Sequence, residues 1–228
     1  MTRVILVRHG QTEWNRVERF RGRVDLALNQ TGLTQARALA ERLADWPIAA
    51  IYSSPLRRAV QTAQPVAERL GLTVQLLPGI VDINYGDWQA KTPAQVAEAY
   101  PDLYRRWLEK PHLVRFPNGE SLDEVRDRAM AALREVVARH DGQAILLVAH
   151  QVVNRVLVCA MLGLDNSHFW RIRQDNGCIN VFDHQDGLFT AVLINDTCHL
   201  NASSKGLWVS GHGYRDLVGG TAESPLPG

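Results

Sequence analysis

The 228-residue chain has few cysteines and no long apolar run. Both features limit the classes of protein to which it can belong. Its three cysteines are too scattered for a disulfide framework or a paired-cysteine metal site, which favours a reducing compartment. No apolar run reaches the ~20 residues of a membrane span, so we expect no association with a membrane. The N-terminal residues lack the pattern of a signal peptide, because a short apolar segment typical of a strand already starts at Val4. We therefore predict a cytoplasmic protein.

An excess of charge of one sign is also missing. The 25 lysines and arginines nearly balance the 24 aspartates and glutamates, which argues against nucleic acid as a partner. Residues 1–23 differ from the rest, because arginines clearly outnumber acidic residues there. This local basic cluster favours an anionic ligand, although a solvated basic loop would have the same composition.

The motifs of several enzyme classes are absent too. The chain has neither the G-x-x-x-x-G-K-[ST] phosphate-binding loop nor the G-x-S-x-G nucleophile turn. Its eight histidines are dispersed without the H-x-x-x-H spacing of zinc enzymes, and we expect no metal site.

Short apolar segments alternate with amphipathic helical segments along most of the chain. The apolar segments are typical of strands and cover residues 4–7, 48–52, 73–77, 144–148, 178–182 and 190–194. The alternation predicts an α/β fold, a three-layer α/β/α sandwich with a mostly parallel central sheet. We predict one domain over residues 1–204 and a C-terminal tail over residues 205–228.

Local signals predict the bounds of the helix that follows residue 53. Ser54 is expected to cap this helix, with Pro55 as its first residue. Pro65 is expected to kink or interrupt the helix, and Gly71 to end it.

The strongest functional signal follows the first predicted strand, where Arg8, His9 and Gly10 stand together. In open α/β sheets, ligands bind beyond the carboxyl ends of the strands, so these residues stand where chemistry usually occurs. Arginine offers a planar fork of donors for phosphate oxygens, and a neutral histidine is a nucleophile near neutral pH. A solvated arginine and a hydrogen-bonded histidine at a strand end are the alternative.

Two further strand ends repeat this pattern. His150 follows the strand at 144–148, where it would face His9 across one crevice or simply cap the next helix. Arg57 and Arg58 follow the strand at 48–52 in the first turn of a helix, whose dipole disfavours positive charge there. An anion bound at that helix N-terminus would relieve the conflict, and a solvated arginine pair is the alternative.

With these residues the chain resembles the histidine phosphatase superfamily, which contains the cofactor-dependent phosphoglycerate mutases. The resemblance covers about residues 1–200 and depends on several motifs that occur in order and at family-like spacing. They are Arg8-His9-Gly10 with Thr12 and Asn15, the Gly22, Asp25, Leu28 and Gly32 pattern, Ser54-Pro55-Leu56 with Arg58, Tyr85-Gly86-Asp87-Trp88, Gly119-Glu120-Ser121, and Ala149-His150.

The resemblance implies that His9 is the nucleophile and becomes a phosphohistidine. It also implies that the phosphoryl group is gripped by Arg8, Arg58 and His150. The same resemblance implies a pocket lined by Asn15, Arg21 and the Gly22 backbone. Such a set positions the phosphoryl group and offsets its charge without a metal or an organic cofactor. Nearby positive charge should keep His9 neutral, whereas bound phosphate should stabilise His150 as a cation.

The chain departs from the family at the proton donor. Family members usually have a glutamate a few residues before the stretch that matches Tyr85-Gly86-Asp87-Trp88, and Asp82 occupies that position here. We expect Asp82 to protonate the leaving oxygen. The alternative is that Asp82 caps a turn and that water or another group supplies the proton. Gln151 is a second departure, because a glycine often follows the histidine in the family.

The leading hypothesis is a metal-independent phosphatase that hydrolyses a small phosphomonoester through a phosphohistidine on His9. A phosphoglycerate mutase, or a catalytically weak protein that binds a phosphorylated ligand, is the alternative. The short spacing from Asp82 to His150 favours the phosphatase, whereas the basic residues at 91, 105 and 106 keep the mutase open. The expected partner is a small phosphorylated metabolite, with a homodimer left open. Sugar phosphates, phosphoglycerates, phosphoserine, nucleotide-pathway esters and cobalamin-pathway phosphates are all compatible with the sequence.

Overall fold

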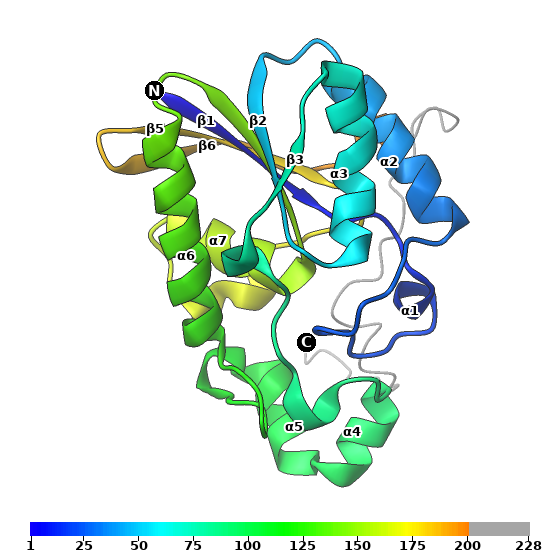
Figure 1. The fold of residues 1–228 in the computed structure, drawn as a ribbon. Helices are drawn as coiled ribbons and strands as arrows, with labels where there is room; N and C mark the ends of the chain where they lie inside the picture. Colours follow the sequence, from blue (N-terminus) through cyan, green and yellow to red (C-terminus); the bar gives the residue numbers. More distant parts are fainter. Residues whose placement is uncertain (201–228) are drawn as a thin grey trace, which may run out of the picture.

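The computed structural model describes residues 1–200, and its elements alternate between strands and helices (Figure 1). The strands are β1 (Thr2–Arg8), β2 (Ile48–Ser53), β3 (Val74–Leu76), β4 (Ala144–Ala149), β5 (Ile179–Gln185) and β6 (Leu188–Asp196). The helices are α1 (Glu13–Arg16), α2 (Gln30–Leu43), α3 (Arg57–Leu70), α4 (Pro93–Ala99), α5 (Pro101–Glu109), α6 (Leu122–Arg139) and α7 (Gln151–Met161). The predicted tail over 205–228 and its boundary lie outside the described residues.

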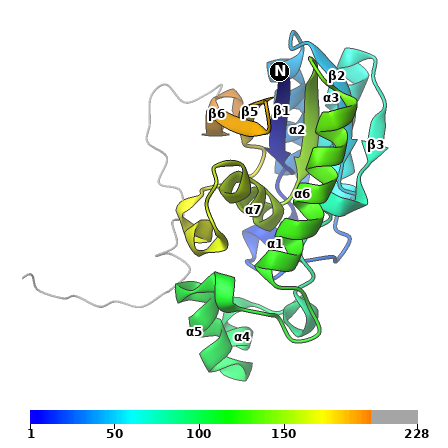
Figure 2. The ribbon, with the colours of Figure 1, turned by 90° about the vertical axis from the view of Figure 1, so that its left-hand side faces the viewer.

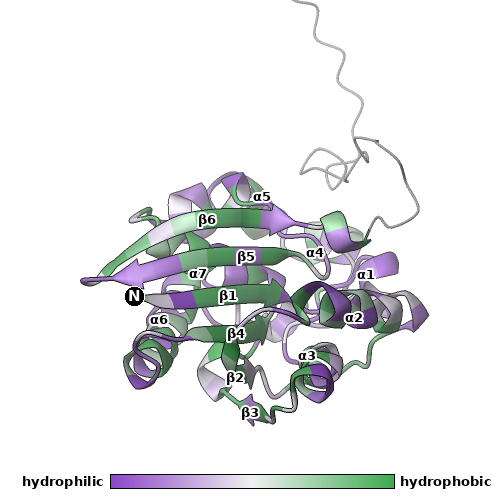
Figure 3. Ribbon diagram, turned by 90° about the horizontal axis from the view of Figure 1, so that it is seen from above, coloured by the Kyte–Doolittle hydropathy of each residue, from purple (hydrophilic) through white to green (hydrophobic). Residues whose placement is uncertain are grey.

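The strands form one sheet in the order β3-β2-β4-β1-β5-β6, which Figure 3 shows from above. β3, β2, β4 and β1 are mutually parallel, and β5 runs antiparallel to β1. β6 forms a hairpin with β5 through a turn at residues 186 and 187. The predicted mostly parallel sheet is therefore confirmed, with its antiparallel part confined to one edge.

Helices cover both faces of the sheet, which explains why the central strands are apolar throughout. On one face, side chains such as Leu6 and Leu147 share a core with α6 and α7. On the other face, alternate residues such as Val7 and Leu146 pack with α2 and α3. The ribbon shows α6 and α7 on one side of the strands and α2 and α3 on the other (Figure 1). The predicted three-layer α/β/α sandwich is confirmed.

Helix α3 differs from its prediction at both the start and the middle. It begins at Arg57, after an extended Leu56, so Pro55 precedes the helix instead of opening it. Pro65 lies inside the helix without interrupting it. The helix continues because its flanking residues Ala63, Val66 and Ala67 are buried against the sheet, which outweighs the lost hydrogen bond. Gly71 ends the helix in a left-handed conformation, as predicted.

The segment with α4 and α5 projects beyond the sheet (Figures 1 and 2). Trp107 and Phe116 are buried in the core and contact each other edge to face at 5.1 Å. These two aromatic residues therefore serve core packing. The nearby Arg105 is exposed and pairs with Asp102 of its own helix.

Candidate active site

The sheet brings His9 and His150 together. β1 and β4 are parallel neighbours paired with Arg8 opposite Ala149, so the residue after each strand is a histidine at the same edge. The two imidazole rings lie 5.2 Å apart between centroids, and both side chains are almost fully buried. The backbone N–H of His9 also donates to the carbonyl of Ala149 at 3.0 Å, which ties the two strand ends together.

The tautomer of His9 follows from its one side-chain hydrogen bond. Its Nδ1 lies 2.6 Å from the carbonyl oxygen of Gly10, and because a carbonyl only accepts, Nδ1 donates. Nε2 of the neutral ring then carries the lone pair. Burial holds the pKa of His9 well below 6.5, and the charges of Arg58 and Arg8 lower it further. His9 is therefore a neutral ring with a nucleophilic nitrogen.

Gly10 is required by close packing. Its backbone N–H donates to Thr62 of α3 at 3.0 Å. A Cβ at this position would lie 2.7 Å from the carbonyl oxygen of Gly32 at the start of α2. A side chain would displace the backbone that holds His9 Nδ1.

His150 contacts a serine and a carboxylate. Its Nε2 lies 2.7 Å from the hydroxyl of Ser54, while its Nδ1 is 3.7 Å from the Oδ2 of Asp82. Burial lowers the pKa of His150 well below 6.5, with Arg58 the next largest cause. The residue precedes α7 in an extended conformation but makes no side-chain cap bond to it, so the interpretation as a mere helix cap is wrong.

Arg58 and Asp82 form a buried ion pair. Arg58 is fully buried and donates through Nη2 to Asp82 at 2.9 Å and to the carbonyl of Gly22 at 2.7 Å. Its Nη1 donates to the carbonyl of Val24. The second oxygen of Asp82 accepts from the N–H of Ile83 at 2.9 Å. Asp82 thus stabilises its own turn and lies beside His150, and its role as the proton donor stays a prediction.

Arg8 is buried and Arg21 is half-buried, and neither has a carboxylate partner in the described part of the chain. Arg8 donates to the carbonyl of Gln174 at 2.6 Å, and Arg21 to the carbonyl of Trp14 at 3.2 Å. Burial lowers the pKa of Arg8 to about 9, and the neighbouring charge of Arg21 adds to this effect. Burial likewise lowers the pKa of Arg21. Two cations held in this way strongly favour an incoming anion.

Asn15 and Gly22 lie on the segment that crosses the site. The Oδ1 of Asn15 accepts from the backbone and hydroxyl of Thr12, so it fixes the short helix α1. Gly22 adopts a positive φ of 49°, and its carbonyl accepts from Arg58. A Cβ at Gly22 would lie 2.9 Å from the carbonyl oxygen of Ile83, so a larger residue would not fit.

The N-terminus of α3 already has its anion. The backbone N–H of Arg57 donates to Asp25 at 2.7 Å, so a carboxylate of the chain itself satisfies this end of the helix. The predicted anion at this helix N-terminus is thus supplied internally, and Arg57 is exposed. Only Arg58 of the arginine pair points toward the site.

Sequence reasoning missed the polar groups that support the site. Ser54 was expected to cap a helix and had no predicted role in the site, yet its hydroxyl contacts His150. Gln174 and Asn180 are buried and exchange two side-chain hydrogen bonds of 2.7 and 2.9 Å beside the strand end that carries Arg8. Asn180 stands within an apolar strand, and a buried amide in such a run is the signal that could have pointed to it.

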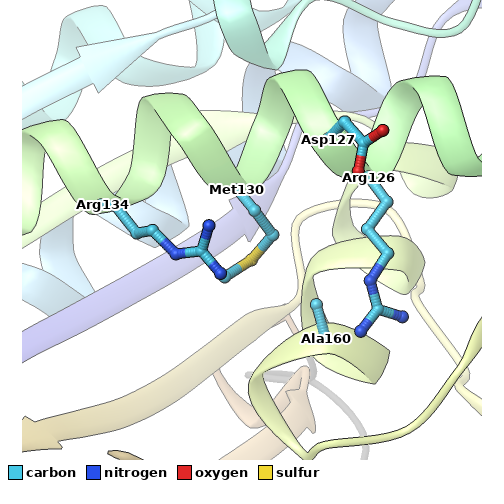
Figure 4. A pocket seen from close by; sticks show the side chains of 5 residues that line it. All are labelled: Arg126, Asp127, Met130, Arg134 and Ala160. Carbon is cyan, nitrogen blue, oxygen red and sulfur yellow. The ribbon is translucent and has the colours of Figure 1, made fainter. Parts of the chain in front are cut away.

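No cluster of histidine, cysteine or acidic residues in the described chain could hold a metal ion. Nor is any described helix long and apolar enough to cross a membrane. A hollow of about 330 Å³ lies between α6 and α7, lined by Arg126, Asp127, Met130, Arg134 and Ala160 (Figure 4). None of these residues belongs to the site around His9 and His150.

Comparison with known proteins agrees with this geometry. Phosphoserine phosphatase 1 of Hydrogenobacter thermophilus is 40% identical over 200 residues, which cover 88% of this chain and 95% of that protein. A metal-independent phosphoserine phosphatase of Arabidopsis thaliana is 31% identical over 206 residues, covering 89% and 84% of the two chains. A mutant phosphoserine phosphatase of Entamoeba histolytica in complex with phosphoserine superimposes with a TM-score of 0.80 at 26% identity, over 88% of this chain and all of the other.

The family sequence model of the histidine phosphatase superfamily (branch 1) matches residues 4–197 of this chain. The match spans β1 to β6 and includes both buried histidines and the arginines around them. The chain therefore belongs to the histidine phosphatase superfamily.

Proposed function

We propose that this protein is a metal-independent phosphatase that uses His9 as its nucleophile and acts on phosphoserine or a close analogue. The observation that carries the proposal is the neutral His9, whose Nδ1–H is fixed by Gly10 while Arg8 and Arg58 lie in the same cluster. Relatives named as phosphoserine phosphatases support the substrate class. These names favour a phosphatase over the mutase and the weak binding protein.

In the first step, His9 Nε2 attacks phosphorus and forms an N–P bond while the P–O bond to the leaving group breaks. Arg8 and Arg58 would stabilise the charge on the equatorial oxygens. When the anionic oxygens of the substrate engage Arg58, Asp82 would take up a proton from solvent and pass it to the leaving oxygen. The position of its Oδ2, 2.9 Å from Arg58 and 3.7 Å from His150, supports this role.

In the second step, water attacks the phosphohistidine and the N–P bond breaks. Inorganic phosphate leaves, Asp82 recovers a proton from the attacking water, and His9 returns to its neutral form. His150 and the pocket residues Asn15, Arg21 and Gly22 would hold the phosphoryl oxygens during both steps. Bound phosphate would supply the negative charge that stabilises His150 as a cation.

The test compares wild type with His9→Ala in EDTA, with an aryl phosphate and O-phospho-L-serine as substrates. We expect wild type alone to release phosphate, and a rapid alkaline quench to trap a phosphoryl group on His9, identified by peptide mass spectrometry. Equal phosphate release by both proteins would refute the role of His9. Transfer of the phosphoryl group between phosphoglycerates without release would instead support the mutase.

We further propose that the protein acts in the cytoplasm, which its three free cysteines support. The expected partner is a small phosphorylated metabolite. The homodimer stays a prediction, which light scattering on the purified protein would test.

A further inference from the structure

Arg155, in the second turn of α7, is a cation for which neither the family motifs nor the steps above provide a role. It donates no hydrogen bond and forms no ion pair within residues 1–200, and its Nε is buried without a partner. Its guanidinium lies over the rings of Trp170 and Phe169, at 4.8 and 5.1 Å from their centroids. The stacking positions the charge yet leaves the edge of the guanidinium, where its donors are, unused.

Arg155 lies near the active site through a chain of ring contacts. The Trp170 ring beneath it contacts Trp107 at 5.2 Å. Trp107 in turn contacts Tyr85, three residues after Asp82, at 6.4 Å.

The charge of Arg155 is one of the causes, after burial and Arg21, that lower the pKa of Arg8. Burial and the charge of Asp82 raise the pKa of Tyr85, and Arg155 is among the arginines that oppose this rise. Tyr85 is buried among aromatic rings, and its hydroxyl has no hydrogen-bond partner within residues 1–200. A guanidinium and a phenol therefore adjoin the phosphate-binding arginines with unused donors.

The charge balance of the site points to a second anionic group. The cluster contains the buried Arg8 and Arg58 and the half-buried Arg21 and Arg155, against Asp82 as the carboxylate that is buried among them. A phosphomonoester dianion would offset two of the remaining positive charges and leave one. Asp175 is close enough to raise the pKa of Arg155, but it already bonds with Arg173 at 2.8 Å.

We propose that Arg155, assisted by the Tyr85 hydroxyl, binds a carboxylate of the substrate and so makes this protein selective for phosphomonoesters that carry one. The inference rests on the proposed phosphatase function and specifies it. Arginine suits the task because its planar fork matches the two oxygens of a carboxylate. The aromatic rings beneath the guanidinium would hold that fork in place.

The test uses two substrates that differ in this group alone, O-phospho-L-serine and O-phosphoethanolamine. We expect Arg155→Gln to lower kcat/KM for phosphoserine about 10- to 100-fold, mainly through KM, because a charged hydrogen bond to the substrate is lost. The value for phosphoethanolamine should change less than about threefold. Arg155→Lys keeps the charge without the fork and should recover part of the phosphoserine activity.

Arg42→Gln is the matched control, because Arg42 also stacks on a tryptophan, Trp46, at 5.3 Å, but stands at the far end of α2. It should leave both substrates unaffected. An equal loss with both substrates in Arg155→Gln would overturn the inference, since Arg155 would then serve folding or the phosphate itself. Unchanged kinetics with both would overturn it as well.

Failure of the phosphatase function has a different signature. It would appear as absence of turnover by wild type with every phosphomonoester, including the aryl phosphate. Calorimetric binding of the two substrates to wild type and to Arg155→Lys would then decide the inference by itself. Tighter binding of phosphoserine to wild type only would support it, and equal binding of both substrates would reject it.

Discussion

The arginines of this protein fall into two groups that differ in burial and in partners. One group lies on the helix surfaces and the other at the carboxyl edge of the sheet. On α5 and α6, Arg105 and Arg139 are exposed and pair with Asp102 and Glu135 one turn earlier. Such pairs are screened by water and contribute little to stability. At the sheet edge, Arg8 is buried and bonds only to a backbone carbonyl.

The difference indicates that the functional site lowers the stability of the fold. Burying a cation without an anion is unfavourable, and here the polar backbone offsets only part of this cost. An incoming phosphoryl group would supply the missing charge. The four predictions that follow test this contrast, beginning with the group that the buried cations keep neutral.

His9→Asn should abolish turnover, with a loss of about 10⁴-fold or more in kcat, because the asparagine amide cannot form the phosphohistidine. Steady-state kinetics with an aryl phosphate measures it. The variant should still bind inorganic phosphate, since the arginines remain. Residual turnover within tenfold of wild type would show that phosphohistidine is not the route.

Arg58→Met should lower kcat by about 10²- to 10³-fold, as expected for a group that stabilises transition-state charge. It should also destabilise the fold by about 3–5 kcal/mol, because Asp82 is left as an unpaired buried carboxylate. Urea unfolding measures the second effect.

The double variant Arg58→Met/Asp82→Asn should regain much of that stability without regaining activity. A double variant no more stable than Arg58→Met would show that the buried ion pair is not the cause.

The two buried histidines should make stability fall in acid. Their folded pKa values lie well below 6.5, so the unfolded chain binds protons first as the pH drops. Stability is therefore complete above about pH 6.5 and declines below it, by at most about 1.4 kcal/mol per pH unit for each histidine. Urea unfolding between pH 5 and 8 measures the slope. His9→Gln/His150→Gln should show a shallower one, and an unchanged slope would contradict the assignment.

Arg139→Ala on α6 should have the smallest effect. Its partner Glu135 is more than half exposed, and pairs of this i,i+4 kind contribute about 0.3–0.5 kcal/mol. Thermal unfolding should shift slightly and kcat should stay constant. A loss of activity would contradict the distinction between exposed arginines, which are not needed for catalysis, and the buried arginines of the site.

The sequence predicted the elements that follow simple physical rules. Apolar segments identified β1 and β4, and polar residues directly after them identified Arg8, His9 and His150. The rest depended on long-range contacts. Pro65 was expected to break α3, but packing of its neighbours decides the outcome. Arg155 lacks a local signal, because its proposed role depends on a tryptophan 15 positions later and on Arg8 at the end of β1.

The ladder between β1 and β4 also determines where this protein can tolerate changes in length. Arg8 opposite Ala149 is the last step of a register that starts at Arg3 and Ala144. Deleting one residue inside either strand would turn every following side chain to the opposite face of the sheet and separate the histidines. Insertions in the exposed hairpin turn at residues 186 and 187 leave this pairing untouched. Variation in length among functional descendants should therefore accumulate in the loops and spare these two strands.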